Sequence, residues 1–371
     1  MHLALPELTG SDPARIDPAR GGVIDVSDRF TTAEMATAAR TGDPVLAEAA
    51  AAAASAGQEG QVAQYLAGVP DLLLRYAGPG GDPYGQAVIT AAMDATRLGH
   101  ASPLPDALLQ EAAIGYLTDA QRTKDIAAWR ETALTWAAEE RKGAVRAVQP
   151  VPPPSGTGIA GYQVADYLDQ HGRRTRQEQL GPLSLWDALT TRTTSALDLT
   201  RLGQAASRRG LYRHAAALWT AATAQGSVAA ARQLIDHLRK VSPSDTMRAA
   251  QWAAGHVSLG DPQGVAWLLG ALRAAGAGDA VRTLADRAAA QASLGDPQGV
   301  ASLLKELDAA RAGDAVRAMA DPAANAGMFD LFLEVQPDEA PNYLFGREPD
   351  GASSQSWRWQ EPISQNSAHR D

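Results

Sequence analysis

The chain contains no cysteine, so disulfide bonds, thiolate metal sites and a cysteine nucleophile are all excluded. Aromatic residues make up only 5% of the 371 residues, and lysine occurs four times. No lysine follows a glycine-rich loop, which excludes the phosphate-binding loop of a nucleotide hydrolase. The seven histidines lack H-E-x-x-H spacing, and no G-x-S-x-G nucleophile elbow occurs. We therefore expect no enzyme, no bound metal and no cofactor.

Long hydrophobic runs are also missing. The longest is the alanine block at residues 49–54, which is too short and too weakly apolar to span a bilayer. The N-terminal sequence MHLALPELTGSDPAR lacks the basic start of a signal peptide. The 33 basic and 42 acidic residues give a net charge of −9, which disfavours non-specific binding to nucleic acid or to an anionic membrane. These features predict a soluble, cytoplasmic protein.

What the sequence does contain is a long internal repeat in an alanine-rich background. SLGDPQGVAWLL begins at Ser258, and SLGDPQGVASLL begins at Ser293, 35 residues later. Each copy has apolar residues at i, i+3, i+4 and i+7, then a glycine-containing turn, then the same spacing again, which predicts two helices. The stripes are Val265, Leu268, Leu269, Leu272 and Val281, Leu284, Ala285, Ala288 in the first copy, and Val300, Leu303, Leu304, Leu307 and Val316, Met319, Ala320, Ala323 in the second.

The boundaries of these helices are marked by aspartate and proline. Asp261 and Asp296 occupy N-cap positions, and a proline follows each at the first helical position, where it loses no hydrogen bond. One helix pair cannot bury its own apolar stripe, so a period of 35 residues predicts an α-solenoid of stacked pairs. Further upstream, Gly203, Ala215 and Trp219 fall at the spacings of a tetratricopeptide repeat.

The fold class predicted is all-α, an array of tetratricopeptide-like helix–turn–helix repeats preceded by an irregular helical domain. We expect an irregular segment at 1–30, a helical domain at 31–147, a Pro/Gly-rich linker at 148–159 and the repeat array at 160–335. A partly disordered C-terminal tail would cover 336–371. The linker contains G-x-G-x-x-G at Gly156, Gly158 and Gly161, but the prolines before it do not fit the buried strand of a dinucleotide site.

The first helices of the repeats are the first candidate for binding a partner. By analogy with tetratricopeptide arrays, they would line a groove for another protein. Its residues would be Arg201, Gln204, Arg208, Gln263, Trp267, Arg273 and Lys305. Trp267 is either a partner's anchor or ordinary packing between repeats, since Ser302 takes its place in the next copy.

An arginine-rich segment is the second candidate. From residue 171 to 213, eight arginines stand against three acidic residues, a local balance of +5. Arg173, Arg174 and Arg176, in HGRRTRQ, are candidate contacts for phosphate or for an acidic protein surface. The alternative is a solvated helix end whose arginines complement the helix dipole.

Several stretches resemble a family of large actinobacterial regulatory proteins: LTGSDPARIDPARGGVIDVSDRFTTAEM, QYLAGVPDLLLRY, AAMDATRLGH, EAAIGYLTD, VADYLDQHGRRTR and FGREPDGASSQSWRW. In that family, a signal-transduction ATPase of the STAND type precedes such a helical region and a variable repeat array. The resemblance covers only that C-terminal part. It implies a regulatory role without an ATPase site, either as a stand-alone sensor arm or as a piece of a longer protein.

The expected function is therefore a non-enzymatic protein-interaction or regulatory module, a sensor or scaffold arm of a signalling system. The partner would be another protein, for which the resemblance suggests a STAND-type ATPase, and no membrane is involved. Two alternatives stay open. One is a nucleic-acid-associated transcriptional regulator that uses residues 171–213, and the other is an accessory subunit of a separately encoded ATPase.

Overall fold

The computed structural model describes residues 31–38, 40, 46–47, 49–51, 69–78, 80–124, 126–140 and 146–356. Within these residues the chain is mostly helical, as predicted, with one short two-stranded sheet. It divides into two compact units, Met1–Arg97 with Pro103–Leu185, and Leu98–Ser102 with Trp186–Asp371. The segment expected to be irregular, 1–30, and the last part of the expected tail, from 357 on, lie outside the described residues.

The first unit is built around a buried helix, α5, in which Val88, Ile89 and Met93 are inaccessible to solvent. Asp82 begins this helix because its Oδ2 accepts a hydrogen bond from the Gly85 N–H at 2.8 Å. The helices of this unit are α1 (Thr32–Ala38), α4 (Val69–Ala77), α5 (Pro83–Leu98), α6 (Asp106–Ala113), the 3₁₀ helix η2 (Ile114–Tyr116), α7 (Asp119–Arg122), α8 (Ile126–Ala137) and α9 (Asp166–Thr175). Helix α10 (Leu183–Arg192) runs across the boundary to the second unit.

The proline-rich segment predicted as a linker forms a β-hairpin inside the first unit. Strand β1 (Val148–Val151) pairs antiparallel with β2 (Gly161–Val164), with Pro150 opposite Tyr162. The backbone N–H and C=O of Tyr162 both bond to Leu104, at 2.8 and 2.7 Å, on the other edge of β2. Pro150 therefore stands where the ladder needs no donor, which explains how a strand tolerates it. The glycine motif lies in this hairpin and opens no helix.

The boundary between the units also differs from the sequence prediction, which placed it at 148–159. Helix α9 belongs to the first unit, because Arg176, its C-cap residue, forms an ion pair with Asp94 of α5 at 2.8 Å. Gly172 lies so close to α5 that an added Cβ would come within 3.0 Å of the Met93 side chain. These contacts join residues about 80 positions apart, so no local sequence pattern indicates them.

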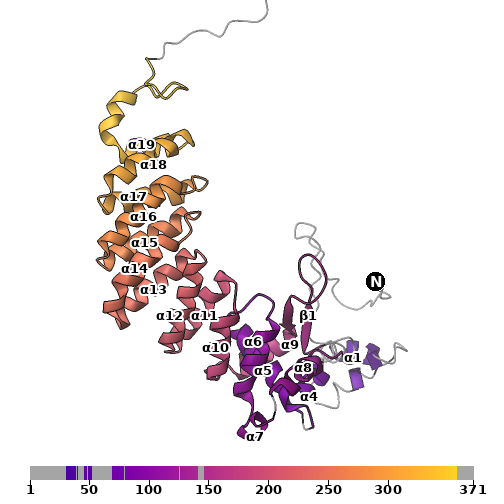
Figure 1. The fold of residues 1–371 in the computed structure, drawn as a ribbon. Helices are drawn as coiled ribbons and strands as arrows, with labels where there is room; N and C mark the ends of the chain where they lie inside the picture. The colour runs from indigo at the N-terminus through magenta and orange to yellow at the C-terminus, as the bar shows by residue number, and fades with distance from the viewer. Residues whose placement is uncertain are drawn as a thin grey trace, which may run out of the picture. The chain divides into compact units, whose positions relative to one another are not determined.

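The second unit consists of successive helices that pack as pairs (Figure 1). The pairs are α11 (Ala196–Arg208) with α12 (Tyr212–Ala224), α13 (Val228–Val241) with α14 (Pro243–His256), α15 (Pro262–Ala274) with α16 (Gly278–Gln291), and α17 (Pro297–Ala309) with α18 (Gly313–Asn325). First helices pack on first helices, α13 on α15 and α15 on α17, while α14, α16 and α18 do the same on their own side. The α13–α14 pair, which precedes the two clear copies, thus packs in the same arrangement as they do.

One continuous hydrophobic core runs through this unit from Val228 to Met328. It contains every residue of the predicted stripes in the first helix of each copy, all fully buried. The predicted caps are confirmed, since Asp261 accepts a hydrogen bond from the Gly264 N–H at 2.9 Å, and Asp296 accepts one from the Gln298 N–H at 3.2 Å.

The last pair is covered by a further short helix, α19 (Phe329–Val335), which packs on α17 and α18. Helix α18 continues past Pro322 to Asn325, so the proline does not end it. Met328 and Phe332 are buried and cover this end of the array. A 3₁₀ helix, η4 (Pro337–Tyr343), follows in the segment predicted as tail.

Candidate partner-binding face

The first helices of three successive pairs share one solvent-exposed side. We call this side of α13, α15 and α17 the first-helix face. It is made by Arg232, Asp236, Arg239, Lys240, Gln263, Trp267, Gly270, Arg273, Ser302, Lys305 and Glu306. These helices bury their opposite sides against the second helices, so the residues of the first-helix face are not part of the hydrophobic core. Its residues are therefore available for contacts with another molecule.

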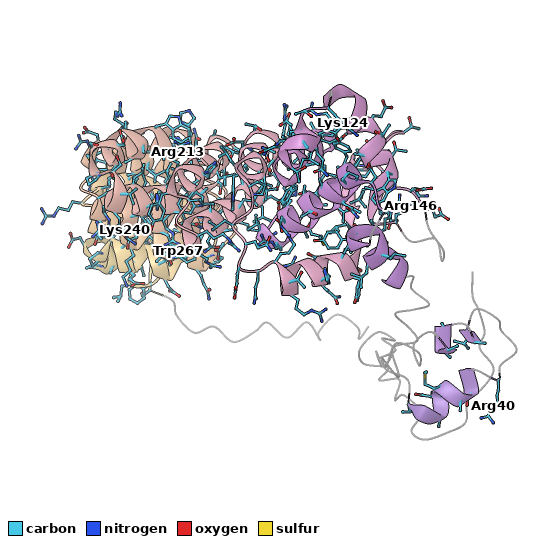
Figure 2. All side chains as sticks on the ribbon, turned by 90° about the horizontal axis from the view of Figure 1, so that it is seen from below. Arg40, Lys124, Arg146, Arg213, Lys240 and Trp267 are labelled. Atoms are coloured by element: carbon cyan, nitrogen blue, oxygen red, sulfur yellow. The ribbon has the colours of Figure 1, made fainter. Side chains whose placement is uncertain are left out.

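Trp267 is the large apolar side chain of this face (Figure 2). It is 61% exposed, and it is the only tryptophan among the exposed large apolar side chains of the residues the structure describes. The guanidinium of Arg232 lies 6.0 Å from the centre of its ring, at the outer limit of a cation–π contact. The sequence left open whether Trp267 packs between repeats. Its exposure shows that the hydrophobic core does not include it.

Polar contacts connect the helices of the first-helix face. Arg239 Nη1 donates to the Ala274 carbonyl at 3.4 Å, and Arg273 forms an ion pair with Glu306 at 2.6 Å. Gln263 accepts a hydrogen bond from the Ser302 hydroxyl at 2.8 Å. Two of the three contacts join residues 35 and 33 positions apart, which follows from the repeat period. The face is thus one surface across three pairs.

The first helices of the two copies differ only on their solvent side. Helices α15 and α17 have nine identical residues of thirteen, and every residue of the buried stripe is kept. The four substitutions place Ser302, Lys305, Glu306 and Asp308 of α17 at the positions of Trp267, Gly270, Ala271 and Arg273 of α15. None of these eight residues is buried. The buried stripe of this first helix is held constant while its solvent side changes.

The structure brings together only part of the predicted groove. Gln263, Trp267 and Arg273 lie on α15, and Lys305 is exposed on the neighbouring helix α17. The other three predicted groove residues, Arg201, Gln204 and Arg208, are exposed on α11. Within the described residues, no hydrogen bond or ion pair links those three to α13 or α15.

Sequence reasoning missed every residue of the first-helix face on α13, among them Arg232 and Arg239. They stand exactly one period of 35 residues before Trp267 and Ala274, which was a usable signal. The sequence of the segment around them does not match SLGDPQGVA, so a search for similar letters does not find it. Its burial pattern matches nonetheless, since Ala231, Leu234 and Ile235 face the core.

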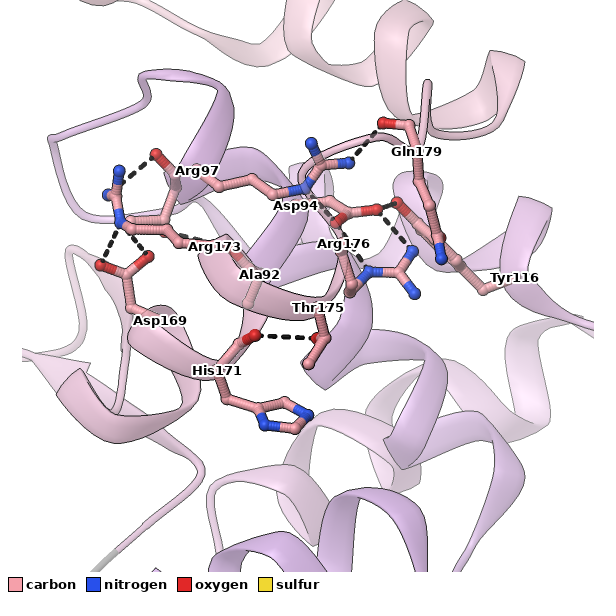
Figure 3. A network of polar contacts seen from close by, with 11 residues as sticks. Ala92, Asp94, Arg97, Tyr116, Asp169, His171, Arg173, Thr175, Arg176 and Gln179 are labelled. Atoms are coloured by element: carbon pink, nitrogen blue, oxygen red, sulfur yellow. Dashed lines mark hydrogen bonds and ion pairs between the residues drawn. The ribbon is translucent and has the colours of Figure 1, made fainter.

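The three candidate contacts of the arginine-rich segment lie in the first unit, and one of them, Arg176, belongs to a buried network (Figure 3). Arg176 donates two hydrogen bonds of 2.8 Å to the carboxylate of Asp94, which is fully buried. Asp94 also accepts from the Tyr116 hydroxyl and from Arg97 Nε, both at 2.6 Å. Burial alone would raise the pKa of Asp94, but the hydrogen bonds from Arg176, Arg97 and Tyr116 outweigh it and lower that pKa. The pKa of Arg176 is raised, mainly by the same hydrogen bonds.

The other two arginines of this candidate are exposed. Arg173 pairs with Asp169 one turn earlier on α9, at 2.9 Å. No ion pair or hydrogen bond of the Arg174 side chain occurs in the described part of the chain. Two of the three predicted contacts for an anionic partner are therefore already neutralised within the protein, and Arg174 remains as a single cation.

Two cavities among the described residues have the size of a small-molecule site. The first, of about 510 Å³, is lined by Asp106, Glu131 and Tyr162. Partial burial raises the pKa of Asp106, and the negative charge of Glu131 adds to this effect. A hydrogen bond from Gln110 lowers that pKa but does not outweigh them. The other, of about 810 Å³, is lined by Phe329, Phe332, Tyr343 and Arg347, whose guanidinium lies 5.0 Å above the Phe329 ring. Neither cavity is lined by a histidine or a lysine.

Among the described residues, no three histidine, aspartate or glutamate side chains gather as metal ligands would, and no helix is both long and apolar enough to cross a bilayer. The chain was compared with models of protein families, with curated proteins and with solved structures. None of them matches it.

Proposed function

We propose that this protein is a non-enzymatic interaction module, a sensor or scaffold arm whose second unit is a solenoid of tetratricopeptide-like helix pairs. Its partner is another protein, which contacts the first-helix face. The observation that carries the proposal is Trp267, a large ring left in solvent at the centre of a surface that the core does not need. Tryptophan and arginine are the residues that most often dominate the energy of protein interfaces.

The difference between the two copies supports the same proposal. The second helices differ as well, but only the first helices exchange an exposed aromatic ring. Here the four substitutions of the first helix lie together on its solvent side, and they change aromatic character and charge. Such a pattern is expected where each pair contacts a different part of one extended partner.

The nucleic-acid alternative has weaker support, because Arg173 and Arg176 are paired with Asp169 and Asp94. The ATPase alternative concerns the identity of the partner and is compatible with the same face. The experiment below distinguishes them, because it identifies the bound molecules.

We expect Trp267→Ser to abolish partner capture without unfolding the protein. Serine is the residue that the second copy carries at this position, so the helix accommodates it. Affinity purification from the native host, with mass spectrometry of bound proteins and nucleic acid, would compare wild type, Trp267→Ser and Arg282→Ala. Arg282 is exposed on the second helix of the same pair, where it forms an ion pair with Asp279.

The captured proteins should fall by at least about tenfold in Trp267→Ser, as for a residue worth 1.4 kcal/mol or more of binding energy, and should persist in Arg282→Ala. Circular dichroism would verify that both variants are folded. Identical capture by the wild type and Trp267→Ser would contradict the proposal, and so would equal losses in the two variants.

A further inference from the structure

The charge on the first-helix face points to the chemistry of the partner. Helices α13 and α15 contain four cations, Arg232, Arg239, Lys240 and Arg273, and a single carboxylate, Asp236. The whole chain, in contrast, has a net charge of −9. A basic region that persists in an acidic protein favours an acidic partner and raises the rate of encounter with it.

The carboxylates of the first-helix face neutralise this region only in part, since Glu306 pairs with Arg273 but only Asp236 lies beside the cations of α13. Asp236 lies 3.9 Å from Arg232 and 4.0 Å from Arg239, so one carboxylate is shared by two arginines at distances too long for a hydrogen bond. On the second helices the charges are matched instead, by aspartate–arginine pairs three residues apart, Asp245–Arg248, Asp279–Arg282 and Asp314–Arg317. The excess of positive charge is therefore specific to the side that carries Trp267.

The shape beside Trp267 suits a side chain of the partner. Gly270 lies one turn after Trp267, and a Cβ at that position would come no nearer than 3.6 Å to another atom, the Oε2 of Glu306. The glycine thus leaves room next to the ring, where the second copy has Lys305. An apolar side chain placed there would cover the indole, and acidic neighbours on either side of it would reach Arg232 and Arg239.

We propose that α13 and α15 bind an acidic peptide segment of a partner protein, with one apolar side chain of that segment seated on Trp267. This inference rests on the proposed function and adds the chemistry of the partner. A peptide is favoured over a nucleic acid because the basic region is short. It ends at α17, where Glu306 and Asp308 would repel a continuous phosphate backbone.

The test uses fluorescein-labelled synthetic peptides and the full chain. One peptide alternates glutamate with serine around a central phenylalanine. The second has lysine for glutamate, the third has serine for phenylalanine, and a single-stranded oligonucleotide of similar length is the fourth probe. Fluorescence anisotropy would be recorded with the wild type, Trp267→Ser, Arg239→Glu and, as a control of equal charge change, Arg282→Glu.

The wild type should bind the glutamate–phenylalanine peptide at least about tenfold more tightly than the other three probes, with an affinity that falls as salt is added. Trp267→Ser and Arg239→Glu should each weaken this binding by about tenfold, and Arg282→Glu should leave it within about twofold. Equal binding of the lysine peptide or the oligonucleotide would overturn the inference, as would equal effects of Arg239→Glu and Arg282→Glu.

The outcome separates this inference from the proposed function. If acidic peptides fail to bind while Trp267→Ser still loses the captured proteins, the first-helix face is the binding surface but its partner is not an acidic peptide. If Trp267→Ser captures the same proteins as the wild type, the face itself is wrong.

Discussion

Replacing Asp94 by asparagine is expected to lower the free energy of unfolding by about 3–5 kcal/mol. The carboxylate is fully buried and accepts hydrogen bonds from Arg176, Arg97 and Tyr116. Asparagine is similar in size but uncharged, so it would leave the two largely buried guanidinium groups without a counter-charge. Urea denaturation followed by circular dichroism would measure the loss, and α9 and α5 should be among the elements that open first.

The matched control is Asp169→Asn, which breaks the exposed ion pair with Arg173 on the same helix. Such pairs contribute at most about 1 kcal/mol, because water screens them. If the two variants lost the same stability, the Asp94 network would not be what holds α9 to the first unit.

The pH dependence of stability provides a second measurement on the Asp94 variant. The pKa of Asp94 is lower in the folded protein than in the unfolded chain, where it is near 3.9. This carboxylate therefore stabilises the fold above that pH, and its contribution is lost as the pH falls through the lowered folded-state pKa. Asp94→Asn should accordingly show a shallower loss of stability on acidification than the wild type.

Replacing Trp219 by alanine is expected to destabilise the second unit by about 3–5 kcal/mol. The side chain is only 3% exposed, and its Nε1 donates to the Thr200 carbonyl at 3.3 Å. A Cβ on Gly203 would lie 2.5 Å from that nitrogen, so the ring rests directly on the backbone of the facing helix. Alanine would leave a cavity between α11 and α12.

Trp267→Ala is the control, because the same chemical change at an exposed position should alter the stability by no more than about 0.5 kcal/mol. Both variants would be compared by denaturant unfolding at equal temperature and pH. Comparable losses would mean that Trp267 is structural, which would remove the main support for the first-helix face.

The sequence predicted correctly the features that depend on the spacing of neighbouring residues along the chain. The aspartate–proline steps at Asp261 and Asp296 set the helix starts, and the stripes of Leu268 and Leu303 set the buried sides. The tetratricopeptide spacing also placed Gly203 against Trp219, a contact sixteen residues apart that the structure contains.

The features that were missed depend on contacts between distant residues. The prolines argued against a strand around Pro150. The sequence does not show that the backbone of Tyr162, which lies opposite Pro150, forms its hydrogen bonds with Leu104 on the other side. HGRRTRQ resembled a solvated basic run, because the buried partner of Arg176 lies 82 residues earlier. Arg232 and Arg239 were overlooked because the sequence around α13 does not match SLGDPQGVA. The helix nevertheless packs beside α15 at the 35-residue spacing of the repeat.

The most direct test of the stacked-pair arrangement uses the absence of cysteine from the chain. Gln263→Cys and Ser302→Cys would place two thiols on successive first helices, at residues whose side chains now share a 2.8 Å hydrogen bond. A short bismaleimide should join these two thiols within one chain. The control combines Arg282→Cys, on a second helix, with Ser302→Cys, on a first helix, and these two thiols should stay unlinked. Crosslinking at equal rates in both variants, or none at Gln263 and Ser302, would contradict the stacking and with it the first-helix face.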